Sequence, residues 1–123
     1  MISVSFSTAD EAVRVKAFGH ANTAPFGQDI VCAAVSALVC TFAAVLREAE
    51  ESEKLLSLEV YLQSGEAEIF CKPKPAHGKE VMAWLRYLEA GVDALAEQYP
   101  EAVKKTGGRL PPLRMGNKPA ATP

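Results

Sequence analysis

Histidine and cysteine are scarce in this chain of 123 residues, which contains only His20, His77 and the thiols Cys32, Cys40 and Cys71. A secreted disulfide scaffold has a denser and even set of cysteines, so we expect reduced thiols and a cytoplasmic protein. No pair among these residues has the close spacing of zinc ligands, which argues against a metal centre. Any chemistry of the chain therefore depends on few side chains.

The chain also has little net charge and only one long apolar stretch. A formal charge of −2 argues against direct binding of duplex nucleic acid, because such binders normally carry a basic face. The first residues lack the basic start and apolar block of a signal peptide. The apolar stretch, residues 30–46, is interrupted by Ser36 and Thr41, so we interpret it as a buried or interface helix rather than a membrane span.

The hydrophobic pattern predicts a single α+β domain with the order ββαββα. Alternation of apolar and polar residues is typical of strands, and spacings of three and four residues are typical of helices. The short connections predict hairpins, hence an antiparallel sheet with two helices packed on it. We expect strands at residues 2–7, 13–17, 56–62 and 67–71, helices at 30–51 and 78–99, a domain over 1–105 and a loosely ordered tail over 106–123.

The first predicted helix is apolar on almost every side, so it must be covered on more than one side. In a protein of this size a partner subunit is an economical second cover.

The start of this helix carries the residues that indicate chemistry. Asp29 precedes the apolar run where an N-cap belongs, which places Cys32 in the first turn. Unpaired N–H groups and the positive end of the helix dipole favour a thiolate there, and the same N–H groups could stabilise an oxyanion. His20 lies just beyond the second strand and is the natural base for a cysteine nucleophile. Ser36 lies one turn beyond Cys32 on the same face.

Several of these residues have a second interpretation. Asp29 could orient the imidazole rather than only cap the helix, although its negative charge opposes thiolate formation. A cysteine in an apolar helix is commonly a packing residue, and Cys40 and Cys71 fit that description. His77 is interpreted as an ordinary surface residue. Gly19 and Gly27 bracket an irregular loop and could act as hinges of a flap that closes over a peptide.

Two boxes of this sequence resemble a known family. They read Gly19-His20-Ala21 and, after the loop, Gly27-Gln28-Asp29-Ile30-Val31-Cys32-Ala33-Ala34-Val35-Ser36. They are similar to the signature of the ribosomal-processing cysteine proteases, the Prp family, and the order of elements is similar up to about Tyr99.

The resemblance implies a bacterial cytoplasmic homodimer that removes an N-terminal extension from the twenty-seventh large-subunit ribosomal protein. It implies Cys32 as nucleophile and His20 as base, Asp29 and Ser36 in the active-site neighbourhood, and Gly19 and Gly27 as loop glycines. No cofactor or metal is implied. The tail, with Arg109, Arg114 and Lys118, lies outside the family pattern.

Two other classes of function remain open from the sequence. The chain could be a non-catalytic, ribosome-associated dimer that binds and shields the extension. It could also be a thiol redox switch, if Cys71 approaches Cys32 in space.

Overall fold

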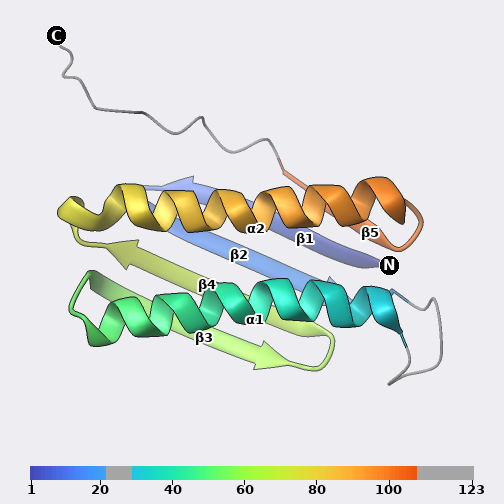
Figure 1. The fold of residues 1–123 in the computed structure, drawn as a ribbon, viewed down its shortest axis with the longest axis horizontal. Helices are drawn as coiled ribbons and strands as arrows, with labels where there is room; N and C mark the ends of the chain where they lie inside the picture. The colour runs from blue at the N-terminus through green and yellow to red at the C-terminus, as the bar shows by residue number, and fades with distance from the viewer. Residues whose placement is uncertain (22–28, 108–123) are drawn as a thin grey trace, which may run out of the picture.

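The structure is a computed structural model that describes residues 1–21 and 29–107, and the predicted hinge Gly27 and most of the predicted tail lie outside these ranges. One layer is a five-stranded sheet and the other is a pair of helices (Figure 1). The elements are β1 (Ile2–Ala9), β2 (Ala12–Gly19), α1 (Ile30–Glu51), β3 (Leu55–Gln63), β4 (Glu66–Pro73), a 3₁₀ turn (Pro75–His77), α2 (Gly78–Gln98) and β5 (Val103–Thr106).

The strand order across the sheet is β3-β4-β2-β1-β5. The first four strands pair antiparallel, as the hairpins predicted, and the α+β class is confirmed. The fifth strand was not predicted, and it pairs parallel with β1, so the sheet is mixed rather than wholly antiparallel. Its four residues include two lysines and follow a proline-containing turn, so the segment has none of the apolar alternation that marks a strand.

Both helices cover the same face of the sheet, side by side and running in opposite directions (Figure 1). The strand residues that point toward them, such as Val4, Val15 and Ile69, are at most 1% exposed. Leu46 of α1 and Leu85 of α2 are completely buried against them. The hydrophobic core therefore lies between the sheet and the helix pair, and the opposite sheet face carries polar residues.

One strand residue departs from the predicted alternation. The register between β3 and β4 shifts between Leu55 and Ser57, which leaves Leu56 59% exposed and buries Leu55 instead. Such a bulge places two residues of one strand opposite one residue of its partner. The pattern that assigned Leu56 to the core face is therefore wrong by one position at this end of β3.

By length and composition alone, α1 is the one helix of the described residues that could cross a membrane. Here it packs along the sheet, and a third of its most apolar window is buried. The side turned away from the sheet exposes small residues, including Ala37, Thr41 and Ala44. The helix is thus a core helix on one side and an uncovered apolar surface on the other.

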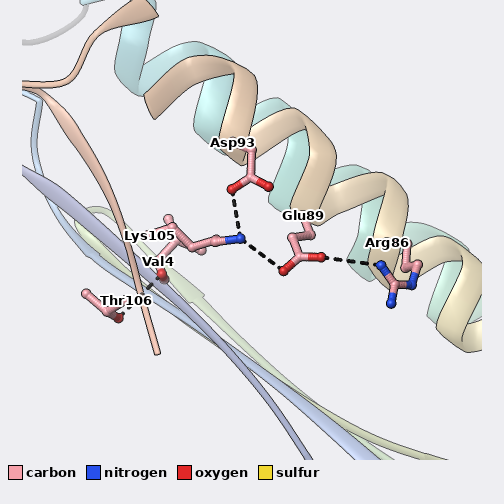
Figure 2. Close-up of polar contacts among 6 residues, drawn as sticks. All are labelled: Val4, Arg86, Glu89, Asp93, Lys105 and Thr106. Atoms are coloured by element: carbon pink, nitrogen blue, oxygen red, sulfur yellow. Dashed lines mark hydrogen bonds and ion pairs between the residues drawn. The ribbon is translucent and has the colours of Figure 1, made fainter. Parts of the chain in front are cut away.

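Ion pairs fasten β5 to α2 (Figure 2). Lys105 on β5 donates to Glu89 at 3.1 Å and lies 2.9 Å from an oxygen of Asp93. Arg86 lies 3.9 Å from the other oxygen of Glu89, whose side chain is only 6% exposed. A buried carboxylate needs such partners because an uncompensated charge in the interior is costly. These contacts explain why a polar segment forms an ordered edge strand.

Candidate active site

Asp29 caps α1 and thereby sets the position of Cys32. Its Oδ1 accepts hydrogen bonds from the backbone N–H groups of Val31 and Cys32, each at 3.0 Å. The carboxylate is buried, with 8% of the residue exposed. The predicted N-cap is confirmed, and Cys32 lies in the first turn of the helix, as expected.

His20 follows β2 directly, and the residue after it contacts the thiol. The backbone N–H of Ala21 donates to the Sγ of Cys32 at 3.2 Å. The two boxes of the sequence therefore meet in space, although eleven positions separate the bonded residues. This hydrogen bond orients the sulfur of Cys32 toward Ala21, the residue that follows the predicted base in the sequence.

The backbone before His20 has a conformation that only glycine adopts easily. Gly19 has a φ of +104°, and a Cβ placed on it would lie 2.1 Å from the carbonyl oxygen of Met1. Any side chain at position 19 would therefore be strained and would collide with the backbone of the first residue. Position 19 therefore requires glycine for steric reasons, and this requirement is independent of the predicted role of Gly19 as a hinge.

These groups line one cavity of about 540 Å³. Its wall includes Gly19, His20, Asp29, Cys32 and Ser36, so the structure brings together every predicted site residue of the described ranges. The full lining is Ile2, residues 17–20, Asp29, one face of α1 between residues 32 and 40, and residues 62–67 of the β3–β4 hairpin.

The hairpin and Cys40 are among the lining residues that sequence reasoning missed. Cys40 lies two turns beyond Cys32 on the same helical face, and this spacing was the one signal that could have found it. The β3–β4 turn gave no such signal, because a glycine in a hairpin turn is common. In the structure the turn is tied to the site, since Gly19 N–H donates to the carbonyl oxygen of Gly65 at 2.9 Å.

The N–H groups at the start of α1 are already engaged. Those of Val31 and Cys32 donate to the Asp29 carboxylate, and Ala33 N–H donates to the Asp29 carbonyl oxygen at 3.1 Å. In this state they are not available to an oxyanion. An oxyanion hole at the helix start stays a prediction.

The other thiol and the other histidine lie away from this cavity. Cys71 is completely buried on β4, and burial together with the carboxylate of Glu50 raises the pKa of its thiol to about 11. Glu50 is eighteen residues along α1 from Cys32, which corresponds to about 27 Å of helix. This separation argues against a disulfide between Cys32 and Cys71.

His77 is half-buried rather than simply exposed, and its Nδ1 lies 2.5 Å from a carboxylate oxygen of Glu80. Residues 1–21 and 29–107 contain no group of three or more acidic, histidine or cysteine side chains placed to hold a metal ion.

A family model described as cysteine protease Prp matches residues 1–104. The chain belongs to this family. It is a cysteine protease, and the resemblance carried by the two boxes is confirmed. The roles of the individual residues within the cavity remain predictions.

Solved structures of other bacterial proteins have a similar fold. The ribosomal processing protease Prp of Staphylococcus aureus, solved with a covalently linked product peptide, is 22% identical with a TM-score of 0.67, covering 86% of this chain and 98% of that one. The same protein solved with a substrate peptide gives 23% identity, a TM-score of 0.60 and the same coverage. The protein SMU.848 of Streptococcus mutans is 27% identical with a TM-score of 0.63, covering 86% and 92% of the two chains. No curated protein sequence matches the chain.

Proposed function

We propose that this family member is a ribosomal-processing endopeptidase with Cys32 as nucleophile and His20 as general base. The observation that carries the proposal is the 3.2 Å hydrogen bond from Ala21 N–H to Cys32 Sγ, because it joins the two boxes at one cavity. Two of the similar structures hold peptides, which supports a peptide as the occupant of this cavity.

The proposed reaction has two stages. The His20 imidazole takes the proton of the Cys32 thiol, and the thiolate attacks the carbonyl carbon of the scissile peptide bond. The carbon–nitrogen bond then breaks, and the imidazolium returns a proton to the departing amine. Water activated by the neutral imidazole hydrolyses the thioester, which releases the acid and restores the thiol.

The proposed substrate is the N-terminal extension of the twenty-seventh large-subunit ribosomal protein. The support is the family membership and the processing activity named for the similar Staphylococcus aureus protein. A cavity of about 540 Å³ accommodates a few residues of an extended peptide, which fits cleavage at a defined position in a flexible extension.

The test is a cleavage assay with a peptide that spans the extension and the mature start of that ribosomal protein. We expect one cut by mass spectrometry, lost in Cys32→Ala and in His20→Ala. Cys40→Ala is the matched control, because it removes a second thiol from the same cavity and should cut normally. A peptide that all the proteins bind and none cuts would overturn the catalytic proposal in favour of the binding and shielding function.

We also propose that the protein acts as a cytoplasmic homodimer in which α1 is covered by a second copy. The uncovered side of α1 supports this, because it exposes Ala37 and Ala44 on an apolar helix. Light scattering across a dilution series should give twice the chain mass, and Ala44→Glu should give the monomer. A wild-type protein that is monomeric at every concentration contradicts the homodimer. Recovery of the protein with the membrane fraction of fractionated cells contradicts the cytoplasmic location.

A further inference from the structure

We propose that Gly65, in the turn between β3 and β4, is a positioning residue for the His20 imidazole. The inference rests on the proposed function, in which His20 is the general base. Gly65 lies forty-five positions from His20 in the sequence, but the hairpin turn and the end of β2 are neighbours in the sheet. Both lie at the end of the molecule where α1 begins (Figure 1).

The imidazole ring lies directly on the backbone of Gly65. A Cβ placed on this residue would lie 2.6 Å from Nε2, 3.1 Å from Cε1 and 3.5 Å from Cδ2 of His20. The first distance is well inside van der Waals contact, so the observed ring position and a side chain at position 65 exclude each other. The missing Cβ of Gly65 is therefore the space that the ring edge occupies.

The same residue also holds the backbone next to the ring. Its carbonyl oxygen accepts the N–H of Gly19 at 2.9 Å, which ties the turn to the residue before His20. Gly65 has a φ of +79°, a conformation that places this carbonyl and the bare Cα toward β2. Gly65 therefore fixes both the backbone that leads into His20 and the surface against which the His20 ring packs.

A side chain at position 65 should displace the ring without unfolding the protein. The colliding atoms are at the far end of the histidine side chain, so the ring can shift within the cavity wall to make room for a Cβ. Such a shift takes the base out of its observed position, and a misplacement of about 1 Å in a reacting group can cost on the order of 100-fold in rate. The collision is therefore expected to appear in kcat rather than in folding.

Gly107 supplies a matched control for the strain of a positive φ. Its φ is +83°, close to that of Gly65, but among the residues that the structure describes a Cβ there would meet only the carbonyl oxygen of Phe6, at an ordinary 3.7 Å. Gly107→Ala therefore has a similar backbone penalty to Gly65→Ala, and it does not touch His20. Gly65→Asn is a third variant, because asparagine tolerates a positive φ yet still carries the Cβ.

The experiment measures kcat, KM and the pH profile of all three variants, together with the NMR signals of the His20 ring through a pH titration. We expect kcat to fall about 100-fold in Gly65→Ala and Gly65→Asn, with shifted His20 signals, and to change less than about threefold in Gly107→Ala. If the Gly65 variants keep the wild-type kcat and the wild-type His20 signals, the inference is overturned. It is also overturned if kcat falls as much in Gly107→Ala as in Gly65→Ala.

The NMR titration needs no substrate, so it separates this inference from the proposed function. If the wild-type protein does not cut the peptide, the proposed function fails. The His20 signals of Gly65→Ala and Gly107→Ala still decide whether Gly65 positions the ring.

Discussion

Removal of the Asp29 cap tests the reasoning about the start of α1. In the structure one carboxylate oxygen satisfies two backbone N–H groups, and one of them belongs to Val31, which is 2% exposed. Asp29→Ala leaves both donors without this acceptor in a region that water reaches poorly. Asp29→Asn keeps an acceptor of the same shape and removes the charge, and asparagine is as good an N-cap as aspartate.

The size of the effect follows from these contacts. Loss of an N-cap costs about 0.5–2 kcal/mol, and an unsatisfied buried N–H costs about 1–3 kcal/mol. Because one donor is buried and the other only partly so, we expect Asp29→Ala to lower the free energy of unfolding by about 2 kcal/mol. For a domain of this size that corresponds to a fall in Tm of about 8 °C. Asp29→Asn should stay within about 0.5 kcal/mol of wild type.

Thermal and urea unfolding followed by circular dichroism measure these values, and the cleavage assay measures the activity of the same samples. If Asp29 acts as a cap, Asp29→Asn retains most of its kcat because Cys32 stays in place. An Asp29→Asn variant with wild-type stability and a kcat lower by about 100-fold or more would refute this reasoning. The carboxylate would then act on the imidazole through its charge.

Three further predictions concern thiols and ion pairs. With iodoacetamide at pH 8, Cys40 should be labelled readily, whereas Cys71 should be labelled only after unfolding because it is buried and its thiol has a pKa of about 11. Peptide mass spectrometry measures the labelling of each thiol. Rapid labelling of Cys71 in the folded protein contradicts the prediction. Lys105→Met should lower the free energy of unfolding by about 2 kcal/mol, since it removes the amine nearest to the buried Glu89, whereas Lys104→Met on the same strand is the exposed control. Burial lowers the pKa of Lys105, but its hydrogen bonds to two α2 carboxylates outweigh burial and raise the pKa above its ordinary 10.5. The stability difference between wild type and Lys105→Met should therefore be constant from pH 7 to 9 and shrink as the pH rises through the higher folded value. A difference that already shrinks from pH 7 to 9 in urea titrations contradicts this assignment.

Local patterns in the sequence were sufficient for most of the elements. The alternation around Val4 and Val15 and the long apolar run over residues 30–46 identified β1, β2 and α1, because these signals depend only on neighbours in the chain. Asp29 was identified as a cap for the same reason, since a cap and its helix are adjacent.

The same holds for the chemistry of the candidate site. Cys32 and His20 were predicted from a helix start, a nearby loop and a family signature, all of which are contained in the eighteen consecutive residues 19–36. The structure places both residues on one cavity, which the sequence could suggest but not establish.

Tertiary structure alone decided three other features. Strand β5 forms because α2 presents Glu89 and Asp93 to Lys105, and no local pattern encodes a strand stabilised by a distant helix. Leu56 leaves the core because the pairing of β3 with β4 slips by one residue, and register depends on both partners.

Gly65 is the clearest case. In the sequence it is one glycine in a hairpin turn, with nothing to distinguish it from other turn glycines. Only the pairing of β4 with β2 brings that turn to the end of β2, where the missing Cβ gives the His20 ring its place. The sequence by itself determined which residues can carry the chemistry, because residue type and local pattern define reactivity. The folded chain decided what surrounds them, because packing joins segments that the sequence keeps apart.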